Sequence, residues 1–253
     1  MKWSKKVINI AIGLGILLLF WQISAVSGQS GKTNIPTVLE VIDAIKELIL
    51  SGVLLEDIGI SLYRFIIGYL SATFFAIVLG LIFGWFEKVW NIIDPIVQVL
   101  RPISPIAWFP FIILAFGIGN LPAIVIIFIA AFFPILLSTV SAVRKIDNIY
   151  LKVAENFEIK GIKFIWKIVL PSIFPYIANA LHIALGSAWI FLVSGEMVGA
   201  QSGLGFLIID SRNSLRFDML LAGIIFIGVI GLLLDKIIGK FEKTVNLKWG
   251  KID

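Results

Sequence analysis

The sequence predicts an all-α integral membrane protein with about six transmembrane helices, and three observations support this. Of 253 residues, 59% are hydrophobic and only 15% are charged, far from the composition of a soluble domain. Apolar runs of about 18 residues or more, long enough to cross a hydrocarbon core of about 30 Å, recur along the chain. Lys and Arg also collect in alternate connecting segments, as the positive-inside rule requires. We therefore expect one membrane domain.

The scarcity of ligating side chains excludes several functions. The chain has no cysteine and one histidine, His182, so disulfides, thiolate metal sites and histidine clusters are excluded, and we expect no metal and no cofactor. No Walker-type motif is present, so the chain is not expected to bind ATP itself. Alone in a span, His182 is expected to be a hydrogen-bonded packing residue, with a proton relay as the alternative.

Residues 1–57 are expected to hold a transmembrane helix followed by an extracytoplasmic amphipathic helix. The first apolar run, about 7–27, follows three lysines, which suits either a retained helix or a signal peptide cleaved near Ser27; we expect retention. Thr37 and Glu40 have the spacing of a capping box, and the apolar residues after them recur at helical intervals until Gly52 can end the run. This second helix is too short and too charged to span.

The second and third spans have opposite signatures. The second, about 58–85, has a small residue at every fourth position, which predicts close packing against a neighbouring helix: Gly68, Ala72, Ala76, Gly80 and Gly84. The third, about 92–117, contains four prolines: Pro95, Pro102, Pro105 and Pro110. Broken backbone at membrane depth is tolerated where protein or a water-filled cavity surrounds it. The third span is thus the first candidate for lining a pathway, with a kinked helix packed in the bundle as the alternative.

Three further spans are expected at about 121–143, 173–198 and 217–238, separated by a polar segment (144–167) and a Gly- and Ser-rich segment (199–216). The span limits place the membrane domain at 58–240 and a basic cytoplasmic tail at 241–253.

The distribution of positive charge predicts the orientation. With six spans, fifteen of the 21 Lys and Arg residues fall on the side of both termini. Four fall on the other side (Lys32, Lys46, Arg212 and Arg216), and Arg64 and Arg101 fall within spans. Both termini and the segment after span four are therefore expected in the cytoplasm, and the net charge of +5 needs no nucleic-acid partner.

The cytoplasmic segment after span four has two short helical patterns, 149–157 and 162–169, followed by Leu170-Pro171. It resembles the "EAA" loop of ABC importer permeases, in which coupling helices dock on the ATPase subunit. Alignment on Leu170-Pro171 places Lys152-Val153-Ala154 at the family's Glu-Ala-Ala, Asn156-Phe157 after it, and Glu158 at its glycine. The alternative alignment starts at Glu155 and uses Gly161 as the glycine.

The resemblance covers most of the chain from about residue 60, and its motifs are similar to those of the nitrate, sulfonate, taurine and bicarbonate group of permeases. They are Ser61-Leu62-Tyr63-Arg64 with Gly68, Arg101 to Trp108, Phe116 to Gly119, Phe132 to Ile135, and Gly195 to Ala200 with Ser202 to Gly205. The resemblance implies a type I importer bundle in a bacterial cell membrane. It also implies a homodimer of permeases, separate ABC ATPase subunits and an extracytoplasmic solute-binding protein.

Three charges in or beside spans are the leading functional candidates, because each costs about 2.5 to 3.5 kcal/mol on insertion scales. On the functional interpretation, Arg64 or Arg101 attracts an anionic substrate and Glu196 helps to gate the outer end. On the structural one, Glu196 pairs with an arginine and fixes the bundle. Together with the broken third span, the candidates for the translocation pathway are Arg64, Arg101, Pro102, Pro105, Trp108 and Glu196.

Two other functions compete with a permease subunit. A self-sufficient secondary transporter or channel has no reason to present paired cytoplasmic helices that end in Leu-Pro. With six spans it would usually need internal repeats, which are not evident. An intramembrane enzyme would need convergent acids, bases or nucleophiles at membrane depth. The substrate stays open among sulfonate, taurine, nitrate, bicarbonate and a pyrimidine vitamin precursor.

Overall fold

The computed structural model describes residues 2–29 and 35–249, and its regular structure is helical throughout this part of the chain. The elements in order are α1 (Lys2–Gln29), α2 (Val38–Leu50), α3 (Val53–Trp85), α4 (Glu87–Leu100), the 3₁₀ turn η1 (Pro105–Trp108), α5 (Phe109–Phe116), α6 (Asn120–Arg144), α7 (Asn148–Asn156), α8 (Ile162–Phe164), the π-helical η2 (Ile165–Val169), α9 (Leu170–Gly199), α10 (Leu204–Asn213) and α11 (Phe217–Trp249).

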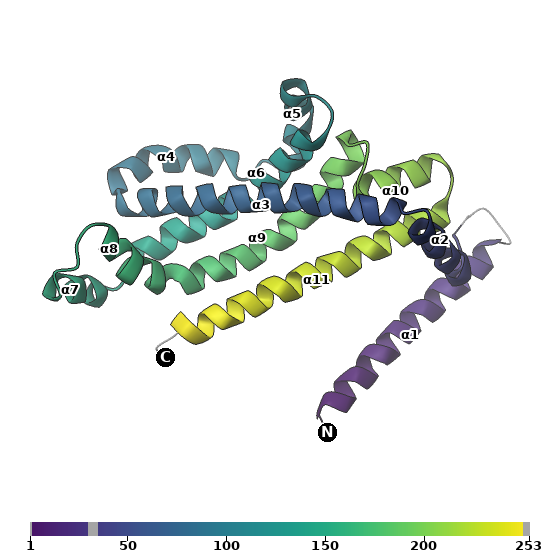
Figure 1. Ribbon diagram of the computed structural model, residues 1–253, viewed down its shortest axis with the longest axis horizontal. Coiled ribbons are helices and arrows are strands. Elements are labelled where there is room, and N and C mark those ends of the chain that lie inside the picture. The colour runs from purple at the N-terminus through teal and green to yellow at the C-terminus, as the bar shows by residue number, and fades with distance from the viewer. Residues whose placement is uncertain (1, 30–34, 250–253) are drawn as a thin grey trace.

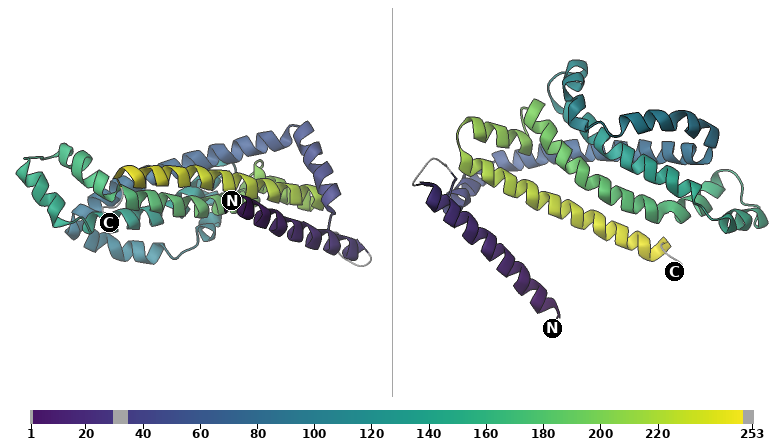
Figure 2. Two further views of the ribbon diagram at one scale, coloured as in Figure 1. Left: turned by 90° about the horizontal axis from the view of Figure 1, so that it is seen from below. Right: turned by 180° about the vertical axis from the view of Figure 1, so that it is seen from behind.

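The bundle is an elongated layer in which α3, α6, α9 and α11 run side by side (Figure 1). The α3–α4 turn, α7, α8 and the carboxyl end of α11 lie toward one end of the bundle, and α2 and α10 lie toward the other. Seen from further directions, α1 joins the bundle at α2 and diverges from it toward the amino terminus (Figure 2). The joint is polar: the Trp21 indole donates to the Pro36 carbonyl at 3.0 Å, and the Val38 N–H donates to Gln22 at 3.2 Å.

Four helices of the described chain are long and apolar enough to cross a membrane: α3, α6, η2 with α9, and α11. A fifth span is formed if α4 and η1–α5 count as one, and these are bent by 87°. The backbone therefore breaks in the proline-rich third segment, as its four prolines predict. The expected count of about six includes this bent pair and the 28-residue α1, whose apolar stretch Gly15–Ser27 is shorter than a span.

The small-residue stripe of α3 packs against α6. A Cβ added to Gly68, Gly80 or Gly84 would lie 2.8, 2.6 and 2.6 Å from a side-chain atom of α6, all closer than real Cβ atoms approach. Ala72 and Ala76 are fully buried between them. The two backbones thus approach closely, as the spacing predicts, and α3 and α6 form a tightly packed seam. Helix α9 packs against α6 in turn, and α11 packs against α9 and α10.

Local signals set most helix limits, with two differences from expectation. The capping box at the start of α2 is present: the Glu40 N–H donates to Thr37 Oγ1 at 3.4 Å and the Thr37 N–H donates to Glu40 Oε2 at 2.7 Å. The helix α10 was not anticipated in the Gly- and Ser-rich segment, where four residues buried at helical spacing hold it in place: Leu204, Leu207, Ile208 and Ser211. The last helix, α11, continues past the expected end of the span to Trp249.

Candidate functional site: a buried ion pair and an open groove

Arg64 on α3 and Glu196 on α9 form a buried ion pair. Arg64 Nη1 lies 2.7 Å from Glu196 Oε1, and the two side chains are 2% and 0% exposed. The rest of the guanidinium is also satisfied, because it donates to the Ser202 carbonyl at 2.7 Å, to Ser202 Oγ at 2.9 Å and to Asn120 Oδ1 at 2.9 Å. A buried charge needs such partners, since an unpaired one is strongly destabilising.

The Glu196 carboxylate accepts bonds from three directions. Ser61 Oγ lies 2.9 Å from both carboxylate oxygens, and the Gly205 N–H donates to Oε2 at 3.0 Å. Ser61 Oγ in turn accepts the Leu204 N–H at 2.9 Å, so its donor and acceptor capacity are both used. The carboxylate is therefore enclosed by α3 and by the turn that leads into α10.

Two glycines allow this turn to wrap the carboxylate. Gly203 has a φ of +101°, and a Cβ there would lie 2.4 Å from Glu196 Oε1. A Cβ on Gly205 would lie 2.4 Å from the carbonyl oxygen of Val193. The Gly203 N–H donates to Asp57 Oδ1 at 2.6 Å, which ties the same turn to the start of α3. The network joins α3, α6, α9 and the turn before α10, and its closed geometry favours the structural interpretation of Arg64 and Glu196.

Sequence reasoning named the two charges but missed their polar partners. The missed residues are Asp57, Ser61, Asn120 and Ser202. A signal was available for two of them, because Asp57, Ser61 and Arg64 are spaced by four and three residues and so share one face of an otherwise apolar helix. Asn120 and Ser202 lie at a helix start and in a turn, where sequence periodicity gives no comparable signal.

Arg101 lies elsewhere, in an open groove of about 420 Å³ between the break after α4 and the helices α6 and α9. The groove is lined by Arg101, Pro102, Ile103, Pro105, Ile129, Ala130, Phe133, Pro134, Leu137, Ser187 and Phe191. Arg101 is exposed, makes no ion pair with any described carboxylate, and is the one charged residue of the lining. An unpaired guanidinium among apolar walls can bind an oxyanion through two parallel hydrogen bonds.

The pathway candidates thus fall into separate places. Pro102 and Pro105 line the groove with Arg101, whereas Trp108 packs beside it in a small cluster with Phe109, its ring 6.5 Å from that of Phe111. Arg64 and Glu196 belong to the buried network. The structure therefore brings three of the six together in the groove and encloses two in the bundle.

The expected helix-turn-helix is present at the end of the bundle. Helix α7 spans Asn148–Asn156, and α8 with η2 spans 162–169, directly before Leu170 and Pro171 at the start of α9. Ala154 is buried, whereas Lys152, Val153 and Asn156 are exposed, and Phe157 directly after α7 is 74% exposed. A large aromatic residue at the tip of a helical turn is available for a protein contact.

The turn between the two helices uses left-handed backbone at both positions proposed for the family's glycine. Glu158 has φ +52° and Gly161 has φ +61°. A residue other than glycine in this region is uncommon and costs energy. Glu158 thus holds a conformation that glycine would adopt freely, and its geometry is compatible with the first alignment.

His182 on α9 is hydrogen-bonded, as expected, but its partners are charged. Its Nδ1 lies 2.5 Å from Glu242 Oε2 and its Nε2 lies 2.9 Å from Asp235 Oδ1, both on α11. Imidazole thereby links the two helices.

Comparison with known proteins agrees with this architecture. Residues 72–246 match the family described as binding-protein-dependent transport system inner membrane component. A putative aliphatic sulfonates transport permease of Bacillus subtilis (strain 168) is 33% identical over 92% of this chain and 84% of its own. A nitrate import permease of Synechocystis is 33% identical over 96% of this chain and 90% of its own. The bicarbonate transport system permease of Synechococcus elongatus is 33% identical over 96% of this chain and 92% of its own.

The fold is also that of a solved importer. An inward-facing conformation of the MetNI methionine ABC transporter matches 79% of this chain and 97% of its own with a TM-score of 0.59 and 17% identity. Fold and family model together define an all-α membrane permease of the type I importer class. The chain belongs to the family of binding-protein-dependent transport system inner membrane components. It is therefore a permease subunit and not an enzyme, and the family implies separate ATPase subunits and a solute-binding protein.

Proposed function

We propose that this permease subunit imports a small oxyanion, and that the Arg101 groove is part of its translocation pathway. The observation that carries the proposal is the single unpaired cation of the groove, which lies where the third span breaks. Relatives named for aliphatic sulfonates, nitrate and bicarbonate all concern anions. A guanidinium between apolar walls suits each of these solutes and does not select among them.

The open side of the groove supports assembly as a homodimer. The groove lies on the surface of one chain, between the α4 break and the helices α6 and α9, and a surface groove by itself encloses no path. A second copy facing it across a two-fold axis would enclose a channel with two Arg101 side chains. The permease pair would then receive solute from the binding protein and alternate its access as ATP is hydrolysed by the partner subunits.

The buried network is proposed to act differently, as the fixed point of the bundle. Arg64 and Glu196 use their hydrogen-bonding groups on protein partners, so neither is available to a solute in this conformation. They hold the turn before α10 against α3 while the groove side carries the transport pathway.

The loop 144–171 is proposed to lie in the cytoplasm and to dock the ATPase. The loop and the α3–α4 turn at residues 85–88, which lies at the same end of the bundle, together have seven Lys and Arg residues against four Asp and Glu. This excess of positive charge supports a cytoplasmic location. Phe157, 74% exposed at the tip of the turn, offers a contact surface for the ATPase. The proposed division, based on the span limits, is an amino-terminal unit (1–57), a permease domain (58–240) and a basic tail (241–253).

Uptake by the reconstituted transporter tests the proposal. The permease, its ATPase and its binding protein are placed in proteoliposomes, and uptake of labelled taurine, alkylsulfonate, nitrate and bicarbonate is measured with and without ATP. We expect ATP-dependent uptake of one of these anions. Uptake by the permease alone, without the ATPase, would show a self-sufficient transporter and contradict the proposal.

The absence of native cysteine makes orientation and docking directly measurable. Leu50→Cys, at a residue that is 87% exposed at the α2 end, should react with a membrane-impermeant maleimide on intact cells. Phe157→Cys should react only after permeabilisation and should cross-link to the ATPase. Reversed labelling of the two variants would overturn the proposed orientation.

A further inference from the structure

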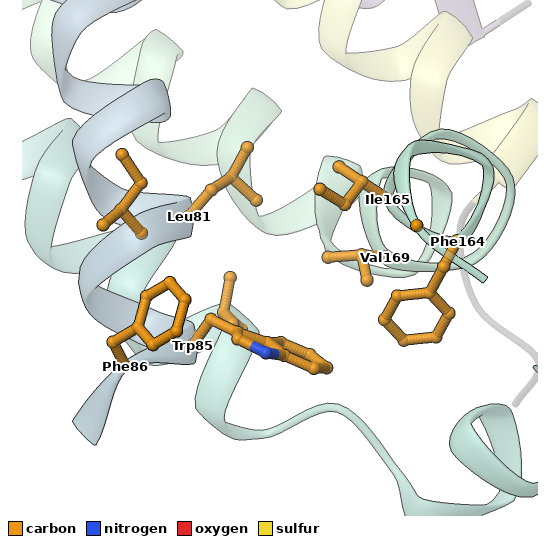
Figure 3. Close-up of a pocket in the computed structure, with 9 residues that line it drawn as sticks. Leu81, Trp85, Phe86, Phe164, Ile165 and Val169 are labelled. Atoms are coloured by element: carbon orange, nitrogen blue, oxygen red, sulfur yellow. The ribbon is translucent and has the colours of Figure 1, made fainter. Parts of the chain in front are cut away.

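A second groove lies at the other end of the bundle, where the end of α3 faces α8 and η2. It has a volume of about 410 Å³. We call it the end groove, and its lining is Leu81, Ile82, Trp85, Phe86, Val143, Gly161, Phe164, Ile165 and Val169 (Figure 3). The volume falls within the range of about 300 to 1,000 Å³ that small-molecule sites occupy.

The end groove is apolar and half open. The side chains drawn in Figure 3 carry one polar atom, the indole nitrogen of Trp85. Trp85 and Phe86 are 50% and 56% exposed, and the rings of Trp85 and Phe164 lie 5.4 Å apart at 67°. Aromatic side chains at the end of a spanning helix are typical of the level where hydrocarbon meets headgroups. An acyl chain therefore fits the groove better than a polar solute does.

The charged residues next to the end-groove lining are mostly positive. Three cations directly adjoin lining residues in the sequence, Arg144, Lys160 and Lys163, against one carboxylate, Glu87. All three cations are exposed, and no Lys or Arg of residues 85–88 or 143–169 forms an ion pair with a carboxylate in the part of the chain that the structure describes. Cations that no described carboxylate neutralises, next to an apolar groove, match a ligand with an anionic head and a hydrocarbon tail.

We propose that the end groove binds an anionic phospholipid of the cytoplasmic leaflet, with an acyl chain along Trp85 and Ile165 and the phosphate near Lys160 and Lys163. Basic pockets between membrane helices on the cytoplasmic side bind anionic headgroups by the same combination of contacts. The proposal rests on the cytoplasmic orientation of the loop 144–171. The lipid would contact α3 and η2 together, and so would bind where the coupling segment meets the membrane bundle.

Quenching of Trp85 fluorescence by brominated lipid tests the site. The complete transporter is placed in phosphatidylcholine vesicles with a minor fraction of phosphatidylglycerol, and the bromine is carried on the acyl chains of one lipid or the other at equal mole fraction. The chain has eight tryptophans, so the difference between wild type and Trp85→Phe isolates the signal of Trp85. We expect brominated phosphatidylglycerol to quench Trp85 with an apparent affinity at least about fivefold higher, the preference expected from one cation.

Charge variants identify the headgroup site. The Lys160→Gln/Lys163→Gln variant should lose this preference, and it spares Arg144, whose guanidinium lies 5.7 Å from the Trp90 ring centre. The matched control, Lys236→Gln/Lys240→Gln, removes two cations of α11 and should keep the preference. Equal quenching by both lipids in wild type, or an unchanged preference in Lys160→Gln/Lys163→Gln, would overturn the proposal.

Absence of any Trp85 quenching would mean that the assembled transporter covers the end groove, which also overturns the proposal. The readout needs neither substrate nor ATP, so a failure of anion transport would leave it intact. The orientation on which it rests is measured separately by the maleimide labelling of Phe157→Cys.

Discussion

The two arginines that the sequence places within spans have opposite environments. Arg64 is enclosed, with a carboxylate 2.7 Å away and three further hydrogen bonds, whereas Arg101 is exposed in a groove and has no charged partner among the described residues. The same residue type therefore lies in two different environments. A charge whose partners are all protein groups stabilises one arrangement of helices, and a charge without them is available to a ligand.

The largest effect on stability is expected when the buried Arg64–Glu196 ion pair is broken. Arg64→Gln leaves the Glu196 carboxylate buried without its cation, and removal of one partner of a buried pair typically costs about 3 to 5 kcal/mol. We expect loss of folded protein, measured as the yield of monodisperse permease and its midpoint of thermal unfolding in detergent. Arg212→Gln, at an exposed arginine, is the matched control.

The combined variant Arg64→Gln/Glu196→Gln removes both charges and should recover part of that loss. Normal stability of Arg64→Gln would show that the network is dispensable, and the distinction between the two arginines would then fail.

The small-residue seam of α3 tests whether close packing, as well as the polar network, fixes this face of the bundle. Gly80→Ala places a Cβ 2.6 Å from Thr139 Cβ, and overpacking of this kind costs about 1 to 3 kcal/mol. In the same helix, Gly59 has no atom within 4 Å of an added Cβ, so Gly59→Ala should leave stability unchanged or raise it slightly. The unfolding midpoint should fall for Gly80→Ala but not for Gly59→Ala, and equal shifts of the two variants would argue against the seam.

Substitution of the exposed Arg101 should reduce transport without changing stability. Arg101→Gln removes a guanidinium that no described carboxylate needs, so the unfolding midpoint and ATPase co-purification should be unchanged. Anion uptake should fall about tenfold, the factor that corresponds to the loss of a hydrogen bond to a charged group. Arg101→Lys should retain part of the uptake. A complex that fails to assemble in Arg101→Gln would assign a structural role to both arginines.

The smallest effect is expected at the turn of the loop 144–171, which, like the Arg101 groove, is exposed. Glu158→Gly relieves the cost of a left-handed backbone, but it also increases the freedom of the unfolded chain, so the net gain should be at most about 1 kcal/mol. Protease protection of this loop should rise slightly. The control is Gly161→Ala, at φ +61°, which should lower the protease protection of the loop. Lower protection in Glu158→Gly would contradict this account of the turn.

Patterns that depend on neighbouring residues were predicted well from the sequence. The capping box of α2, the helical turn 149–169 and the broken third span are determined within a few residues by hydrogen-bonding groups, periodicity and proline. The stripe of α3 also predicted a close contact, because a small residue at every fourth position has few other uses in lipid. The stripe did not identify α6 as the partner, since many apolar helices could fill the same role.

The sequence by itself determined that this chain is a membrane bundle with two arginines at depth, because hydrophobic length and charge are local properties. Only the tertiary structure decided which arginine is paired. Glu196 is 132 residues from Arg64 in the chain, and Asn120 and Ser202 come from two further places. The choice between Arg64 and Arg101 as its partner depends on how α3, α6 and α9 pack, and helix packing is set by the whole surface of each helix rather than by any motif.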